Sequence, residues 1–554
     1  MPEFVGKPQM FAIASGDRHL PPSQNFLKTF EGRVGTSVAT APVMLATAHT
    51  SALLGLDPHP IRVEVDSLRG ISDFILVGLA EASVRESRVR VSSALRQLGV
   101  TLSEHALVVN LAPADMKKNG GAFDLAIAAA VLGALGQIPP TSLNSTLILG
   151  ELSLNGTVRP VRGVLPQLMG AHRNGATHAI VPRENGAEAG AVEGLQVLVA
   201  DTLDQVRRHL QGLEVLPKAS RSEFHPDVAG GLDLLDVKGQ HQARRMLEVA
   251  AAGSHHILMI GPPGGGKTML ARRLPSILPP LTHAESLDIS VVHSVAGVLP
   301  PESGLVRRRP FRAPHHTVSD AGLVGGGSPP RPGEISLAHQ GVLFLDELAE
   351  FRRSSLEALR QPLEDGMLTI SRAGVRATFP ARPLMVAAVN PCPCGYAGDP
   401  SGRCRCGAER VRAYRAKLSG PLLDRIDLHV MLPAVDVGSL RTTIPGECST
   451  AVRARVERAR ALQAERLQRG ETTVPTNALL SSRELDEVAI PDEAGARLLV
   501  AAVERLGLSA RAYSKVLRVA RTIADLDGSD AVRVAHIAEA IHARVLDREQ
   551  ALSG

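Results

Sequence analysis

Eight consecutive residues of this 554-residue chain read Gly261-Pro262-Pro263-Gly264-Gly265-Gly266-Lys267-Thr268. They match the pattern G-x-x-x-x-G-K-[S/T] at every fixed position, and the apolar run 257–260 precedes them. Helix-forming residues follow, so the sequence predicts strand, loop and helix in that order. In this order the loop's backbone N–H groups surround a phosphate at a helix N-terminus. Lys267 would contact the β- and γ-phosphates of ATP, and Thr268 would bind Mg²⁺.

A second apolar run, 342–345, ends in two carboxylates, Asp346 and Glu347. It follows the loop after about 80 residues, where an ATPase places its acidic strand. Asp346 would hold Mg²⁺ through water, and Glu347 would polarise the attacking water. Solvated acids at a strand end are the alternative, but the pairing with the phosphate loop favours an ATP-hydrolysing site.

A third apolar run, 383–389, ends at Asn390 and resembles the AAA+ ATPase strand whose amide orients the lytic water. Downstream, Pro-Leu-Leu-Asp-Arg-Ile-Asp at 421–427 resembles the arginine-finger segment of the same proteins. By that resemblance, Arg425 would reach the γ-phosphate bound to a neighbouring subunit. A structural salt bridge from Arg425 to Asp424 or Asp427 is the alternative.

Two further segments extend the resemblance to AAA+ ATPases. Residues 236–240, before the loop, resemble the segment on the adenine side. Leu508-Ser509-Ala510-Arg511-Ala512 resembles the sensor-2 segment, with Arg511 as first candidate and Arg518 on the same helix as its rival. The resemblance implies an α/β core with a parallel sheet, followed by an all-helical C-terminal lid.

More specific stretches resemble the ComM/YifB family of the magnesium-chelatase clade. They are Gly78-Leu79-Ala80, Val84-Arg85-Glu86-Ser87, 110–115, 312–317, Gly325-Gly326-Gly327, 390–396 and 419–429. The resemblance covers residues 44–548 and implies a homohexameric, ATP-driven motor on single-stranded or branched DNA. ComM proteins promote branch migration while transforming DNA is integrated. The alternatives are a magnesium-chelatase-type motor subunit and a protein remodeller without a DNA role.

Composition and hydrophobic patterning divide the chain into five parts. They are an N-terminal extension, disordered or mis-started (1–43), an α/β domain (44–213), a linker (214–230), the AAA+ core (231–436) and the helical lid (437–554). The α/β domain resembles Lon protease, whose catalysis needs a Ser–Lys pair. Ala122 stands at the serine position and Leu165 at the lysine position, so we predict that it has no peptidase activity.

Overall composition limits the partners. The net charge of +5 permits a nucleic-acid partner. The chain has no Trp and 3% aromatic residues, so phosphate contacts would have to dominate DNA binding. No apolar run approaches the roughly 20 residues that span a bilayer, and the N-terminus lacks the apolar core of a secretory signal. The sequence therefore predicts a cytoplasmic protein without membrane partners.

Four of the five cysteines, Cys392, Cys394, Cys404 and Cys406, lie within fifteen residues. Four thiolates suit a tetrahedral Zn²⁺ site, although C-x-C is tighter than the usual C-x₂-C spacing. Redox-active thiols and unliganded cysteines are the alternatives. Basic residues surround this knuckle (392–406), with Tyr396 and Tyr414 among them: Arg403, Arg405, Arg410, Arg412, Arg415 and Lys417. The cluster is either a DNA-gripping surface or a solvated basic face.

Overall fold

The computed structural model describes residues 45–79, 81–118, 120–221, 223–227, 231–372, 375–398, 402–418, 420–434 and 446–544. The predicted extension, 1–43, lies outside these ranges. Residues from Met44 onward group into one compact unit. Within the described ranges, no helix has both the length and the hydropathy that crossing a bilayer requires.

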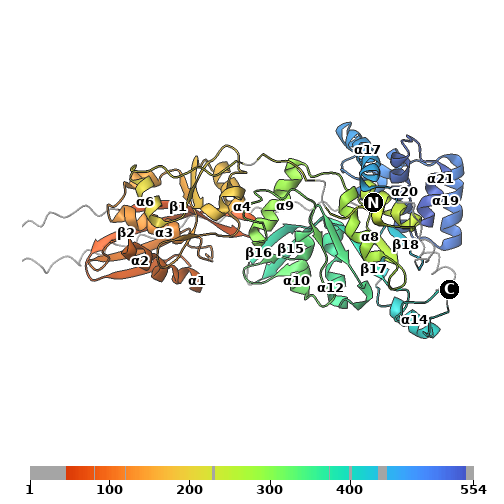
Figure 1. Cartoon of the computed structure of the whole chain (residues 1–554), viewed down its shortest axis with the longest axis horizontal. Coiled ribbons are helices and arrows are strands. Elements are labelled where there is room, and N and C mark those ends of the chain that lie inside the picture. The colour runs from red at the N-terminus through yellow and green to blue at the C-terminus, as the bar shows by residue number, and fades with distance from the viewer. Residues whose placement is uncertain are drawn as a thin grey trace, which may run out of the picture. The chain divides into compact units, whose positions relative to one another are not determined.

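The front domain, which carries the labels β1, β2 and α3 in Figure 1, is built on a seven-stranded mixed sheet. The strand order is β3-β4-β2-β1-β5-β8-β9. The strands are β1 (Ala46–Leu54), β2 (Asp57–Arg69), β3 (Asp73–Val77), β4 (His105–Ala112), β5 (Thr146–Ile148), β8 (His178–Pro182) and β9 (Gln196–Ala200). Helix α3 (Asp124–Ala134) packs against β1 and β2 and is buried at every position, as its alanine-rich apolar run predicts. Residues 217–219, in the predicted linker, hydrogen-bond along β9.

The AAA+ core contains a five-stranded parallel sheet in the order β11-β14-β17-β10-β18. Its strands are β11 (Phe311–Arg312), β14 (Val342–Leu345), β17 (Leu384–Val389), β10 (Ile257–Ile260) and β18 (Leu428–Met431). Every residue of β10, β14 and β17 is buried, as expected for central parallel strands covered on both faces. Side chains alternate between two cores: Ile257 and Met259 join one, and Leu258 and Ile260 join the other.

Helices around this sheet connect it to the nucleotide loop and the lid. They include α7 (His241–Gly253), α8 (Lys267–Arg273), α9 (His283–Ala296), α12 (Arg353–Ala358), α13 (Arg360–Asp365) and α14 (Ala408–Arg415). The sequence from Leu368 to Phe379 predicts a hairpin that turns at Ala373-Gly374. Strands β15 (Met367–Arg372) and β16 (Val375–Pro380) form an antiparallel pair with Leu368 opposite Phe379. The predicted turn itself lies outside the described residues.

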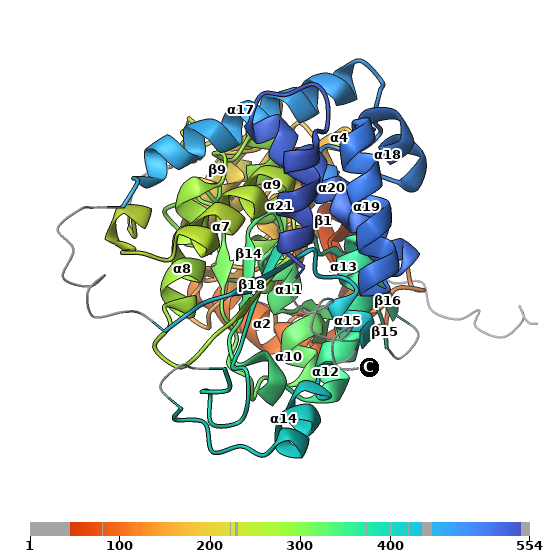
Figure 2. The same cartoon turned by 90° about the vertical axis from the view of Figure 1, so that its right-hand side faces the viewer.

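The C-terminal part is helical, as predicted, and its helices gather into one bundle (Figure 2). They are α17 (Ser449–Gln468), α18 (Ser482–Val488), α19 (Glu493–Leu506), α20 (Ala510–Leu526) and α21 (Val534–His542). The bundle shares a hydrophobic core with the AAA+ sheet: Val452, Val456 and Leu517 join the cluster that contains Ile257. The lid therefore packs directly on one face of the nucleotide-binding sheet.

Candidate ATP site and metal centre

The phosphate loop has the predicted strand–loop–helix geometry, between the end of β10 and the start of α8. Gly264 and Gly266 have φ of +75° and +85°, a region that L side chains rarely adopt. A Cβ on Gly261 would lie 2.6 Å from the carbonyl oxygen of Leu432. Gln240, in the segment that resembles the adenine side, donates from Nε2 to the carbonyl oxygen of Gly265 at 3.2 Å. The glycines are therefore required by the shape of an anion-binding loop.

Lys267 and Asn390 meet inside this loop. The Lys267 Nζ donates to the carbonyl oxygens of Gly261 and Pro262 at 2.6 and 3.0 Å, and to Oδ1 of Asn390 at 3.0 Å. Partial burial lowers the pKa of Lys267, while Asp346 and Glu347 act in the opposite direction. The structure thus brings together the predicted phosphate ligand and the predicted water-orienting amide, although they are 123 residues apart in sequence.

The predicted magnesium ligands are also adjacent. The Thr268 Oγ1 donates to Oδ2 of Asp346 at 2.8 Å, and the backbone N–H of Glu347 donates to Oδ1 of Asp346 at 3.0 Å. A hydroxyl and a carboxylate are oxygen ligands of the kind Mg²⁺ prefers. The donor set therefore fits a magnesium ion between the loop and β14.

Sequence reasoning assigned no role to His316, which lies next to the predicted catalytic base. Its Nδ1 is 3.4 Å from Oε2 of Glu347, and its ring centroid is 4.1 Å from that of His315. Glu347 itself has φ of +51°, an uncommon conformation for a non-glycine residue. The only signal for this contact in the sequence is the His315-His316 pair, within the segment 312–317 that resembles the ComM/YifB family.

Arg425 makes structural contacts, and its ion pair is with a residue that the sequence did not suggest. It pairs with Glu364, whereas the predicted alternatives were Asp424 and Asp427. Its Nε and Nη1 donate to the carbonyl oxygens of Arg360 and Pro421 at 3.1 and 2.7 Å. A role as arginine finger remains a prediction, and it would require the guanidinium to leave Glu364.

The two sensor-2 candidates differ in their surroundings. Arg511 is 69% exposed in the first turn of α20, and its Nη1 lies 4.0 Å from Oδ2 of Asp424. Arg518 is more buried and donates from Nε to the carbonyl oxygen of Leu480 at 2.8 Å. Burial lowers the pKa of Arg518. Arg518 thus has a structural role inside the lid, which leaves Arg511 as the candidate available for a nucleotide.

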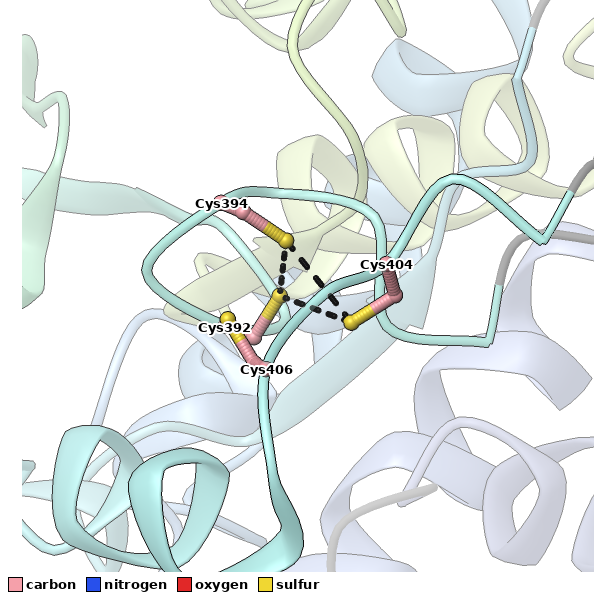
Figure 3. A group of neighbouring side chains, drawn as sticks. All are labelled: Cys392, Cys394, Cys404 and Cys406. Atoms are coloured by element: carbon pink, nitrogen blue, oxygen red, sulfur yellow. Dashed lines mark hydrogen bonds between the residues drawn. The ribbon is translucent and has the colours of Figure 1, made fainter.

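The four clustered cysteines converge as a metal site requires (Figure 3). Their Sγ atoms all lie within 4.8 Å of one another, and Cys392, Cys394 and Cys404 are separated by 3.3–3.8 Å. A tetrahedron with Zn–S bonds of about 2.3 Å has edges of about 3.8 Å, so the spacing fits zinc. Backbone N–H groups of Tyr396 and Arg405 lower the pKa of Cys394 to about 6, whereas burial and the neighbouring thiols raise the pKa of Cys404 to about 11 and that of Cys406 as well. Crowding of the four thiols thus opposes the ionisation of two of them, and a bound cation would offset this.

The basic residues around this knuckle are all exposed, but its two tyrosines differ. Tyr396 is partly exposed, and the guanidinium of Arg403 lies 4.5 Å from its ring centroid. Tyr414 is buried in the hydrophobic core, with 6% of its surface exposed. Helix α14 turns Tyr414 inward, so Tyr396, and not Tyr414, is available for stacking on a base. Lys417 also has an acidic neighbour, Glu350, at 3.4 Å.

The knuckle touches the phosphate loop. Gly395 has φ of +85°, and a Cβ there would lie 2.4 Å from Cδ of Pro263. The knuckle therefore contacts Pro263, the third residue of the phosphate loop. It also follows Asn390 closely in the chain. A movement of the loop on nucleotide binding would therefore displace the segment that carries the cysteines.

At the Lon-like positions, Ala122 is partly exposed and Leu165 is fully buried. A hydrogen bond from the Leu165 backbone reaches the buried Glu188, whose pKa is raised by burial. Ser294 on α9 donates to the same carboxylate at 2.5 Å. The element that bears the lysine in Lon proteases thus takes part here in packing against the AAA+ core.

Comparison with known proteins places these features in one family. Three family models match successive parts of the chain: "Subunit ChlI of Mg-chelatase" over residues 63–185, "Magnesium chelatase, subunit ChlI" over 233–440, and "Magnesium chelatase, subunit ChlI C-terminal" over 446–544. Lon protease 2 of Bacillus subtilis is 28% identical over 169 residues, 29% of this chain and 30% of that protein. The partial match agrees with a Lon-like front domain.

Longer matches cover almost the whole chain. An uncharacterized protein of Mycobacterium tuberculosis is 45% identical over 502 residues, 90% of this chain and 98% of that protein. Protein YifB of Escherichia coli and the competence protein ComM of Haemophilus influenzae are each 42% identical, over 91% of this chain and 98% of their own lengths. The chain therefore belongs to the ComM/YifB family of magnesium-chelatase-like AAA+ ATPases.

Proposed function

We propose that this ATPase is a homohexameric DNA motor that acts in branch migration during the integration of transforming DNA. The observation that carries the proposal is the contact between the candidate ATP site and the basic cysteine knuckle, Gly395 against Pro263. Through this contact, a movement of the phosphate loop during ATP turnover would move the knuckle, whose basic side chains are suited to bind DNA phosphates. The similarity to a competence protein points to the same class of substrate.

Hydrolysis would proceed from the residues already assembled. Lys267 would contact the β- and γ-phosphates, and Asn390, 3.0 Å from its Nζ, would orient the attacking water. Glu347 would accept that water's proton. Thr268 and Asp346 would hold Mg²⁺, which would neutralise negative charge on the phosphates. Arg425 of a neighbouring subunit would stabilise the transition state, with Arg511 at the same interface.

DNA binding would use the knuckle, stabilised by Zn²⁺ on its four thiolates. A structural zinc fixes a short loop that has too few apolar residues to fold alone. The exposed basic side chains would then contact phosphates, and Tyr396 would stack on a base. These contacts are largely independent of sequence, as a translocating motor requires.

ATP hydrolysis by the purified protein tests this function directly, measured without DNA, with single-stranded DNA and with forked DNA. Glu347→Gln should keep ATP binding and lose turnover, since the amide cannot accept a proton. Stimulation by DNA that disappears in Glu347→Gln supports the motor. Hydrolysis that no DNA changes would refute it and direct attention to a protein remodeller or a chelatase-type role.

A further inference from the structure

The segment that follows the predicted arginine finger is held by the lid of its own chain. The Nζ of Lys515, on α20, donates to the carbonyl oxygen of Ile426 and pairs with Oδ1 of Asp427, both at 3.1 Å. Arg544, beyond α21, donates from Nη1 to the carbonyl oxygens of Ile426 and Asp427 at 3.3 and 3.2 Å. Two cationic side chains of the lid therefore hold Ile426 and Asp427, the two residues that follow Arg425.

This attachment is buried and reaches the nucleotide sheet. Lys515 is 6% exposed and Asp427 is 5% exposed. The other carboxylate oxygen of Asp427 lies 3.2 Å from Nδ1 of His255, which precedes β10, and Nε2 of His255 lies 2.7 Å from Oγ1 of Thr522 on α20. Separating such a pair would leave an uncompensated buried charge at a cost of several kcal/mol. The lid and the segment must therefore move together.

The same face of α20 makes a second contact with this segment. Arg511 and Lys515 are four residues apart and so lie on one side of the helix. Arg511 lies 4.0 Å from Asp424, the residue before Arg425. Lys515 pairs with Asp427, two residues after Arg425. Helix α20 also packs against α7, which leads into β10 and the phosphate loop. One helix thus connects a chain's own ATP site to the finger that the chain offers its neighbour.

We propose that Lys515 is a positioning residue that couples the lid to Arg425, so that the nucleotide state of one subunit sets the finger acting on the next. The inference rests on the proposed function, because it requires Arg425 to act on a neighbouring subunit. Lys515 touches neither nucleotide nor water in this scheme. Its removal should lower turnover at the neighbour's site and leave binding at its own site intact.

Mixed-subunit ATPase assays separate these effects, using Lys515→Met, Arg425→Ala and Glu347→Gln. Lys515→Met alone should retain binding of a fluorescent ATP analogue and lose about 10²-fold in kcat, the effect of a misplaced catalytic group. Glu347→Gln binds ATP without turning it over, so its own finger stays correctly placed. An equimolar mixture of Lys515→Met with Glu347→Gln should recover about a quarter of wild-type activity in randomly mixed rings, since half of the chains are competent and half of those have an intact neighbouring finger. A mixture with Arg425→Ala should recover none.

Matched controls make the outcomes decisive. Arg497→Met removes another lid cation, from an exposed pair with Glu493 at 3.3 Å, and should change nothing. The double variant Asp427→Asn/Lys515→Met removes both buried charges; it should fold stably and behave like Lys515→Met in the mixtures. Unchanged turnover in Lys515→Met, lost ATP-analogue binding, or equal recovery with both partners would overturn the coupling. Failure of Glu347→Gln to rescue Arg425→Ala would instead refute the finger in trans, and the coupling with it.

Discussion

Replacing Cys404 and Cys406 by serine removes two of the four converging thiols and should release the metal from the knuckle. Structural zinc contributes about 10–16 kcal/mol of apparent binding free energy in small Cys/His sites, and two thiolates cannot supply most of it. We expect about one zinc per chain in the wild-type protein and less than about a tenth of that in the double variant. Metal released into a colorimetric chelator measures both values.

The size of the DNA effect follows from the exposed charges. Six basic side chains surround the knuckle: Arg403, Arg405, Arg410, Arg412, Arg415 and Lys417. Each phosphate contact to single-stranded DNA contributes about 0.7 to the slope of log K against log salt concentration. If half of these cations contact phosphates, the collapsed knuckle should lower that slope by about 2. Affinity should fall most at low salt, where counterion release contributes most.

Fluorescence anisotropy with labelled single-stranded DNA over a series of salt concentrations gives the affinity and the slope together. Cys448→Ser is the matched control, since Cys448 lies outside the cluster and should leave both unchanged. A double variant that has lost its metal but keeps the wild-type affinity and slope would refute the reasoning. The basic cluster would then be a solvated face, and the zinc would have a purely structural purpose.

Further predictions concern the two tyrosines near the knuckle and a histidine that precedes β10. Tyr396→Ala should weaken binding of single-stranded DNA by about 1–3 kcal/mol in the anisotropy assay without changing the melting temperature, whereas Tyr414→Ala should destabilise the core by about 3–5 kcal/mol in denaturant unfolding. Burial lowers the pKa of His256 to about 4, below its unfolded value of about 6.5, so the stability it contributes is complete above pH 6.5 and is lost as pH falls towards 4. The free energy of unfolding, measured from pH 8 to pH 4, should show this loss. His256→Asn keeps an acceptor for the Met385 N–H and should make the free energy of unfolding less dependent on pH. Parallel pH curves for the variant and the wild-type protein would contradict the prediction.

Local patterns in the sequence were sufficient for the parts of the site that consist of contiguous motifs. Three buried strands are followed directly by the phosphate loop, Asp346 and Asn390, respectively. Parallel strands have their carboxyl ends at the same edge of the sheet. Their meeting could therefore be predicted without knowing the contacts. The convergence of the cysteines followed equally from close spacing in the chain.

Contacts between distant segments could not be predicted in this way. The pairing of Arg425 with Glu364 depends on how α13 lies against the finger segment, a relation that neither motif encodes. The burial of Tyr414 could not be predicted, because a short helix among basic residues can turn one aromatic inward, and a hydrophobic period over eight residues is too short to indicate this. His316 approaches Glu347 because β11 and β14 are parallel neighbours, so the residues that follow the two strands lie at the same edge of the sheet. Strand β11 has two residues, which is too short to recognise from the sequence.

The pairing of Arg425 also bears on how a motor of this kind avoids unproductive hydrolysis. In this structure the guanidinium is held by Glu364 and by two backbone carbonyl oxygens, so it is not displayed for a neighbour. Arg425 is 16% exposed but Glu364 is 59% exposed, so solvent reaches one side of this pair and makes it weaker than a fully buried pair. The buried Lys515–Asp427 pair is much harder to break, because both of its charges lack solvent. A weak contact at the guanidinium and a strong one at the two residues that follow Arg425 would let Arg425 change partners while its segment stays attached to the lid.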